Sequence, residues 1–242
     1  MGNTLTPRYE NAEKTGVLQL AGLKLADVPV EVKALQNVRS LDISMNRITV
    51  LKPWIQLLKA LKVLNVQGNK LSILPVELCQ LQKLENLNAS NNLLNRFFPA
   101  GSAVNVPPFR SLRIVLLAHN QLTEFPPELC SASTPITSID LSHNQISVVP
   151  EYISTSQVIE LNLDGNKIAS IAETIADCPR LKKLQLDYNK LTLEAFPIAL
   201  FTRSPVSRIT VEHNLFYMRD FVALDGYDQY LQRYTAVQKK TT

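Results

Sequence analysis

The sequence predicts an α/β solenoid, with a parallel β-sheet on its concave face and short helices or 3-10 turns on its convex face. One pattern, LxxLxLxxNxL with other apolar residues at some leucine positions, occurs eight times in the 242 residues. The copies are centred on eight asparagines: Asn46, Asn69, Asn92, Asn120, Asn144, Asn166, Asn189 and Asn214. Their spacing ranges from 22 residues, between Asn144 and Asn166, to 28 residues, between Asn92 and Asn120. A period of this size indicates a repeat architecture.

Each copy contains an LxL core in which apolar and outward positions alternate. Alternation with a period of two predicts a short strand with one buried face. Strands of this kind, stacked in parallel, bury the leucines of each repeat against those of the next. The segment after the strand begins with proline in several repeats, as in LPVELCQLQKL from Leu74 to Leu84. Proline suits a first helical turn, so these segments predict short helices on the convex side.

The repeated asparagine follows the strand, where the chain must turn. Its side-chain amide offers two donor hydrogens and an acceptor oxygen. Buried backbone groups need hydrogen-bond partners, and a turn lacks those that a sheet provides. We therefore expect the eight asparagines to form a ladder, one per repeat, that satisfies the turning backbone.

These repeats resemble the leucine-rich repeat family, in its intracellular form of roughly 23 residues per repeat with LxxLPxxL on the returning arm. The resemblance covers residues 15–216, about nine repeats when the degenerate copy VLQLAGLKLADVP is included, in which Leu23 replaces the asparagine. The resemblance implies a scaffold that binds a protein partner on its concave face.

Repeat arrays need specialised ends. We expect residues 1–14 to form an N-terminal cap and candidate lipid-anchor segment, and residues 217–242 to form a C-terminal helical cap and tail. Phe221, Leu224, Tyr227 and Leu231 follow one another at intervals of three or four residues. This spacing predicts one short helical segment whose apolar face covers the last repeat.

The three cysteines, Cys79, Cys130 and Cys178, occupy apolar positions of the convex arm in separate repeats. Cysteine at such a position packs as a small buried hydrophobic residue. An odd number of dispersed cysteines also indicates reduced thiols. Metal or redox chemistry is the alternative interpretation.

The three histidines, His119, His143 and His213, all precede the repeat asparagine, which places them at the rim of the concave face. We expect surface side chains there, with contact to a protein partner as the alternative. His119 and His143 belong to consecutive repeats, about 5 Å apart along the sheet. Two imidazoles could bind a metal weakly, but no third ligand is evident, so no metal site is expected.

Several function classes lack support in the sequence. There is no GxGxxG, Walker, HExxH or GxSxG motif, so we expect neither catalysis nor a cofactor. No run of about 18 apolar residues predicts a membrane-spanning helix. The net charge of +4 is modest, and we expect no nucleic-acid partner. Residues 1–70 carry ten Lys/Arg against five Asp/Glu, which favours an acidic partner or an anionic lipid surface, or is ordinary solvated charge.

The outward positions of the concave strands are the expected partner-binding surface. Ile114, Leu116 and Ala118 give the middle repeat an apolar face flanked by His119 and His143, which is either an anchor pocket or a tolerated exposed leucine. The candidate partner-binding residues are Ile114, Leu116, Ala118, His119, Asp140, His143, Asp164, Asp187, Tyr188 and Glu212.

Asp164, Asp187 and Glu212 form an acidic stripe across adjacent repeats. Like charges at this spacing are destabilising unless cations neutralise them. Lys183 and Arg208 could neutralise them internally; otherwise the stripe favours a basic partner segment.

The repeat between Asn92 and Asn120 is about five residues longer than its neighbours. It contains Phe97, Phe98 and Phe109 among prolines. The insertion is either a recognition loop or a tolerated bulge.

The N-terminal sequence Met1-Gly2-Asn3-Thr4-Leu5-Thr6 fits the N-myristoylation pattern at Gly2, although Pro7 departs from it. Both ends of the chain also resemble a small intracellular group of leucine-rich repeat proteins regarded as N-myristoylated. We expect a monomeric, non-enzymatic cytoplasmic scaffold for protein partners, tethered to membranes as a peripheral protein if Gly2 is acylated. The alternative is a regulatory subunit or adaptor of an enzyme, such as a phosphatase or a component of a small-GTPase pathway.

Overall fold

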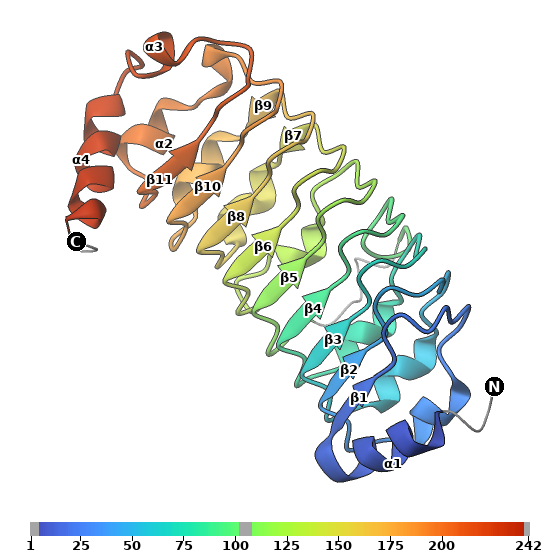
Figure 1. Ribbon diagram of the computed structural model, residues 1–242. Coiled ribbons are helices and arrows are strands. Elements are labelled where there is room, and N and C mark those ends of the chain that lie inside the picture. The colour runs from blue at the N-terminus through green and yellow to red at the C-terminus, as the bar shows by residue number, and fades with distance from the viewer. Residues whose placement is uncertain (1–4, 102–107, 240–242) are drawn as a thin grey trace. The chain divides into compact units, whose positions relative to one another are not determined.

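The computed structural model describes residues 5–101 and 108–239. The chain divides into two compact units, which are described separately. Unit 1 comprises Met1–Gln121 with Ser133–Pro135, and unit 2 comprises Leu122–Ala132 with Ile136–Thr242. Within each unit, short parallel strands alternate along the chain with short helices, as the predicted α/β repeat architecture requires (Figure 1).

Unit 1 begins with a helix and continues with strands and 3-10 helices (η) in turn. Its elements are α1 (Thr6–Thr15), β1 (Val17–Gln19), η2 (Val30–Ala34), β2 (Ser40–Asp42), η3 (Pro53–Leu57), β3 (Val63–Asn65), η4 (Val76–Gln80), β4 (Asn86–Asn88) and β5 (Ile114–Leu116). The five strands pair in parallel and in register, so that Leu41 lies beside Leu64 and Leu64 beside Leu87. The middle residue of each strand is buried, which confirms the predicted alternation.

Unit 2 repeats this arrangement and adds further elements. They are η6 (Pro127–Leu129), β6 (Ser138–Asp140), β7 (Val148–Val149), η7 (Glu151–Thr155), β8 (Glu160–Asn162), β9 (Ser170–Ile171), η8 (Glu173–Asp177), β10 (Lys183–Gln185), η9 (Leu193–Ala195), α2 (Ile198–Thr202), β11 (Arg208–Thr210), α3 (Met218–Phe221) and α4 (Tyr227–Gln238). Strands β6, β8, β10 and β11 pair in parallel in that order. A separate two-stranded pair joins β7 to β9.

The repeat asparagines bond to the backbone of their own repeat and of the preceding one. Asn69 is typical: its Nδ2 donates to the carbonyls of Ile43 (3.0 Å) and Val66 (2.9 Å), and its Oδ1 accepts the Ile48 N–H (3.0 Å). Seven of the eight side chains are buried, and Asn214 in the last repeat is half-buried. Each amide therefore satisfies backbone groups that the turn would leave without partners.

The longer repeat in unit 1 turns its aromatic side chains inward. Phe97, Phe98 and Phe109 are each 2% exposed, and their rings lie 4.5 to 6.4 Å apart between centroids. These three rings extend the core of the unit, so they are not available as recognition residues. The rest of the insertion, residues 102–107, lies outside the described residues.

Helix α1 has Pro7 in its first turn and Gly16 as its C-cap. Proline fits there because the first N–H groups of a helix have no partner within it. Gly16 has a φ of 72°, and its N–H donates to the Ala12 carbonyl. Pro7, the departure from the lipidation pattern, thus has a structural role at the start of the helix.

The C-terminal segment differs from the single helix that the sequence predicted. Two helices form, α3 and α4, because Gly226 between them adopts a left-handed φ of 82°. The residue of α4 that packs into the core is Tyr230, whereas Leu231 is 44% exposed. The prediction that Leu231 belongs to the apolar face was therefore wrong, because the preceding residue, Tyr230, packs into the core instead. The break at Gly226 resets the helical phase, which a spacing count across the glycine cannot anticipate.

Candidate functional site

The exposed side of the strands in each unit, called here the strand face, carries the residues proposed from the sequence. The position just before each repeat asparagine has a positive φ in every repeat: Met45, Gly68, Asn91, His119, His143, Gly165, Tyr188 and His213. His119, His143, Tyr188 and His213 are exposed. Sequence reasoning missed this backbone constraint, although two glycines and one asparagine in the same column were a signal for it.

The last residue of five strands, β2, β3, β4, β6 and β8, accepts a hydrogen bond from the N–H two residues further on. The residues that do so are Asp42, Asn65, Asn88, Asp140 and Asn162, at 2.9 to 3.1 Å. The side-chain oxygen thereby closes an Asx turn. Asp140, proposed as a partner contact, thus has one carboxylate oxygen bonded to the Ser142 N–H.

In unit 1 the strand face is apolar at β5. Ile114 is 37% exposed, and Leu116 and Ala118 are half-buried. Leu116 occupies the position that closes the Asx turn in other repeats, and its side chain cannot accept a hydrogen bond. Among the described residues, none provides an acceptor for the Ala118 N–H. This stretch therefore presents apolar side chains beside a solvent-accessible backbone N–H.

In unit 2 the carboxylates of the acidic stripe bond to the backbone of the following repeat. Asp164 Oδ1 accepts the Asp187 N–H (2.8 Å), and Asp187 Oδ1 accepts the Glu212 N–H (2.6 Å). Gln185 also donates to Asp164 Oδ2 (3.1 Å). Burial raises the pKa of Asp164, and the hydrogen bond from the Asp187 N–H opposes that rise.

The expected neutralisation of this stripe by Lys183 and Arg208 is not found. The ion pairs formed between described residues do not include either cation. Backbone N–H groups take that role at Asp164 and Asp187. A carboxylate can be stabilised by such donors without a neighbouring cation.

Two exposed rings of unit 2 stack on each other. The phenol of Tyr188 and the imidazole of His213 lie 4.2 Å apart between centroids, at 15° between planes. Two repeats earlier, the imidazole of His143 lies over Gly165, where a Cβ would come within 2.6 Å of Nδ1. The sequence placed Tyr188 and His213 in one column but did not predict their stacking.

The cysteines do not form a reactive cluster. Cys79 and Cys178 are buried, as predicted, but Cys130 is only half-buried. Desolvation raises the pKa of both the Cys130 and the Cys178 thiol to about 12. Within residues 5–101 and 108–239, no group of three His, Cys, Asp or Glu side chains is arranged to hold a metal ion.

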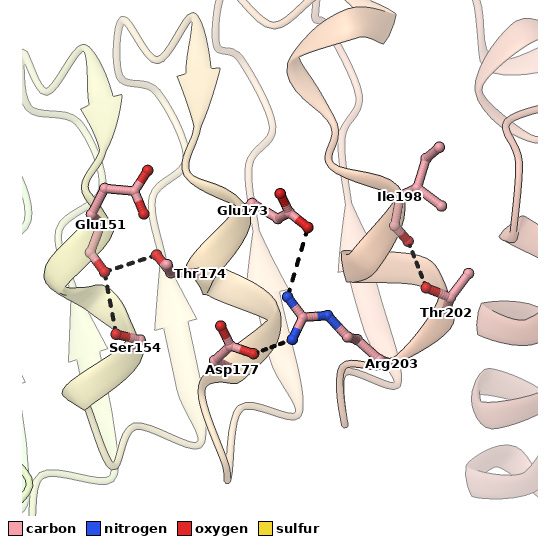
Figure 2. Close-up of polar contacts among 8 residues, drawn as sticks. All are labelled: Glu151, Ser154, Glu173, Thr174, Asp177, Ile198, Thr202 and Arg203. Carbon is pink, nitrogen blue, oxygen red and sulfur yellow. Dashed lines mark hydrogen bonds and ion pairs between the residues drawn. The ribbon is translucent and has the colours of Figure 1, made fainter.

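The opposite side of unit 2 is held together by polar contacts between repeats (Figure 2). The hydroxyl of Thr174 donates to the Glu151 carbonyl at 2.8 Å. Arg203 pairs with Asp177 and lies 3.7 Å from Glu173. The carboxylates of Asp177 and Glu173 therefore interact with Arg203 within the unit.

The two units divide the proposed partner-binding residues between them. Ile114, Leu116, Ala118 and His119 belong to unit 1, and the remaining six belong to unit 2. His119 lies in unit 1 and His143 in unit 2, so their expected proximity stays a prediction. Gly2 lies outside the described residues. None of the helices within residues 5–101 and 108–239 has both the length and the apolar composition of a membrane span.

Family models match two parts of the chain, and solved structures share its fold. Two leucine-rich repeat models match the chain, at residues 33–94 and 132–148. Internalin C2 of Listeria monocytogenes is similar in structure, with 20% identity, a TM-score of 0.68, and coverage of 84% of this chain and 83% of that one. A Leptospira interrogans leucine-rich repeat protein has 21% identity and a TM-score of 0.52, with coverage of 87% of this chain and 70% of that one.

A plant receptor is also similar in structure. The ectodomain of the Arabidopsis thaliana receptor kinase GASSHO1/SCHENGEN3, solved in complex with CASPARIAN STRIP INTEGRITY FACTOR 2, has 23% identity and a TM-score of 0.61. The match covers 82% of this chain but only 24% of that ectodomain. Likenesses at these identities show the fold, which is a leucine-rich repeat fold.

Proposed function

Starting from the leucine-rich repeat fold, we propose that this protein is a non-enzymatic scaffold that binds a protein partner on its strand face. The observation that carries the proposal is the presence of exposed apolar and aromatic side chains there, at positions that contribute little to the core. Ile114 is 37% exposed in unit 1, and Tyr188 is 59% exposed in unit 2. Aromatic and large apolar side chains are enriched at the centres of protein interfaces.

The structural relatives give the proposal independent support. One similar ectodomain was solved in complex with CASPARIAN STRIP INTEGRITY FACTOR 2, and a second relative is a plant peptide hormone receptor in complex with RGF2. A repeat fold of this type thus accommodates protein or peptide ligands. The Ala118 N–H, without an acceptor among the described residues, offers a partner one backbone hydrogen bond.

Affinity capture from cytosol, read by mass spectrometry, tests the proposal. Ile114→Glu places a charge in the apolar part of the strand face without disturbing a buried side chain. Val30→Glu is the matched control, because Val30 is 67% exposed on η2, away from the strands. We expect Ile114→Glu to lose the specific partners and Val30→Glu to retain them. If both variants capture the same proteins as the wild type, the strand face is not the binding surface.

The same capture distinguishes a general scaffold from a regulatory subunit. A phosphatase or a small-GTPase component among the partners lost with Ile114→Glu would identify the protein as an adaptor of that enzyme. A partner set without an enzyme would exclude the regulatory role.

We further propose a cytoplasmic location with N-myristoylation of Gly2. The support is the sequence Met1-Gly2-Asn3-Thr4-Leu5-Thr6. One myristoyl chain binds membranes only marginally, so the tether would be reversible. Intact-mass measurement after expression in eukaryotic cells tests it, with Gly2→Ala as the control. An unmodified wild-type N-terminus would refute the lipidation.

A further inference from the structure

The C-terminal cap of unit 2 contains a cavity that is separate from the strand face. Its volume is about 380 Å³, and its lining residues are Leu193, Glu194, Phe196, Ile198, Phe201, Leu224 and Asp225. Helices α2, α3 and α4 gather at this end of the unit (Figure 1). Pockets that bind small ligands or side chains commonly measure about 300–1,000 Å³, so this cavity is large enough for a bulky apolar side chain.

The walls of the cavity are held firmly. Phe196 and Phe201 are buried and pack edge-to-face against Phe221, at 5.0 and 5.6 Å between centroids. On the other side, Gly226 lets the loop after α3 approach α2 so closely that a Cβ would lie 2.5 Å from a Thr202 methyl group. The loop residues Leu224 and Asp225 therefore stay in place beside α2, and the cavity is preformed.

The mouth of the cavity combines an apolar surface with two carboxylates. Ile198 is 56% exposed at the first residue of α2. Glu194 and Asp225 are both exposed, and neither forms an ion pair among the described residues. Hydrogen bonds from the Thr192 hydroxyl and from its own backbone N–H lower the pKa of Glu194, so this carboxylate is ionised at neutral pH.

These features restrict the occupant. An apolar cavity alone would accept any apolar group, but the two carboxylates repel a fatty acid headgroup or an anionic lipid surface. They favour a cation placed beside the apolar group. We propose that the cap cavity binds a segment of a partner protein in which a bulky apolar side chain is flanked by lysine or arginine. The apolar side chain enters between Phe196 and Leu224, and the flanking cation lies near Glu194 and Asp225.

Fluorescence anisotropy with labelled peptides tests the proposal on the full chain. The probe is the hexapeptide Gly-Lys-Leu-Phe-Arg-Gly, compared with Gly-Glu-Leu-Phe-Glu-Gly and with Gly-Lys-Ser-Ser-Arg-Gly. We expect the basic apolar peptide to bind about tenfold more tightly than either of the others. Equal binding of the three peptides, or no binding of the first, would overturn the proposal.

Variants locate the binding. Ile198→Asp should weaken the basic apolar peptide by about tenfold, whereas Leu231→Asp, which alters a similarly exposed side chain on α4, should leave it unchanged. Replacing Glu194 by Gln together with Asp225 by Asn should reduce the preference for basic over acidic flanks by about fivefold. Binding that survives Ile198→Asp would place the peptide elsewhere and refute the assignment.

Two other occupants give distinct results. If cis-parinaric acid binds the wild type and Ile198→Asp abolishes that binding, the cavity accepts an acyl chain and the proposal is wrong. If sedimentation equilibrium shows a dimer that Ile198→Asp dissociates, the occupant is a second copy of this chain. Neither result bears on the strand face, which Ile114→Glu tests separately.

Discussion

The phenol ring of Tyr188 stacks on the imidazole of His213, with 4.2 Å between centroids and 15° between planes. The two residues precede the asparagines of consecutive repeats, and both adopt a positive φ near 56°. Hydrogen bonds between the repeats fix their backbones, since the Tyr188 N–H donates to the Glu212 carbonyl at 2.8 Å. The stack is therefore a rigid aromatic surface that is available to solvent.

Replacing Tyr188 by alanine should weaken partner capture more than it weakens folding. Because the ring is 59% exposed, we expect the free energy of unfolding to fall by only about 0.5 kcal/mol. Partner affinity should fall about fivefold, as for a moderate interface contact. Urea unfolding and quantitative capture measure the two effects. Tyr217→Ala, which removes a 70% exposed tyrosine from the C-terminal cap, should leave capture unchanged; an equal loss there would argue against a role for the stack.

Replacing a ladder asparagine should be much more destabilising. Asn69→Ala removes the partners of the Ile48 N–H and of the Ile43 and Val66 carbonyls, all in a buried site. Unsatisfied buried polar groups cost about 1–3 kcal/mol each, part of which water recovers. We expect the free energy of unfolding to fall by about 3 kcal/mol in urea titrations.

The last ladder residue is the natural comparison. Asn214 makes similar bonds, to the Leu191 N–H and the Leu186 and Val211 carbonyls, but it is half-buried. Asn214→Ala should therefore cost about half as much as Asn69→Ala. Equal costs at the two sites would mean that burial does not determine the contribution of the ladder.

The sequence predicts the parts of this structure that recur. The leucines and asparagines occur at a regular spacing, and that spacing was enough to place the LxL strands, the short helices and the turns, but not the extra strands β7 and β9. Features that depend on one residue could not be predicted from that spacing. From the sequence, the insertion with Phe97, Phe98 and Phe109 is either a recognition loop or a tolerated bulge, because the packing of the three rings against one another is tertiary. The helix break at Gly226 goes with its left-handed φ of 82°, which a count of apolar spacing does not report.

The candidate site was predicted in composition but not in geometry. Reading the outward columns found Asp164 and Asp187, since residues two apart in a strand share a face. Tyr188 came from the separate column just before the repeat asparagine. For the acidic stripe the sequence offered either neutralisation by Lys183 and Arg208 or a basic partner segment, because only side-chain charges are visible in a sequence. Backbone donors are present in every residue, so the bonds from the Asp187 and Glu212 N–H groups leave no compositional signal.

Gly165→Ala should destabilise unit 2, and His143 should determine part of the cost. Gly165 has a φ of 66°, and an added Cβ would lie 2.6 Å from His143 Nδ1. The backbone strain costs about 1 kcal/mol, and displacing the imidazole adds to it. We expect a loss of about 2 kcal/mol in the wild type but about 1 kcal/mol in a His143→Ala background. Identical losses in a double-mutant cycle would show that the imidazole does not contribute.

The Cys130 and Cys178 thiols should react slowly in the folded protein. Burial raises the pKa of each to about 12, so the thiolate that attacks an alkylating reagent is scarce at pH 8. Iodoacetamide labelling followed by peptide mass spectrometry should show little modification of either cysteine until guanidinium unfolds the chain. Rapid labelling of native Cys178 would contradict its burial.

The same pKa values imply a loss of stability at high pH. In the unfolded chain these thiols ionise near pH 9, whereas in the folded protein they remain protonated up to about pH 12. The unfolded state therefore binds fewer protons in this window, and the free energy of unfolding decreases as pH rises through it. Below about pH 9, the pKa of these thiols in the unfolded chain, their full contribution to the free energy of unfolding is present. Urea titrations of the wild type and of Cys178→Ala should converge as pH rises from 8 to about 11.

Arg233 should hold helix α4 against the end of unit 2. Its Nη2 donates to the Phe201 carbonyl at 2.6 Å, and its Nε donates to the Val206 carbonyl at 2.9 Å. A guanidinium reaches two carbonyls at once, which a lysine ammonium cannot do with the same geometry. Arg233→Lys should therefore accelerate hydrogen exchange in residues 227–238, because α4 opens more often, while the amides of β2 in unit 1 keep their exchange rates. Arg219→Lys alters an exposed arginine of the same cap and should leave hydrogen exchange in α4 unchanged. If Arg219→Lys also accelerates that exchange, loss of any guanidinium loosens the cap. The carbonyl contacts of Arg233 would then not be what holds the helix.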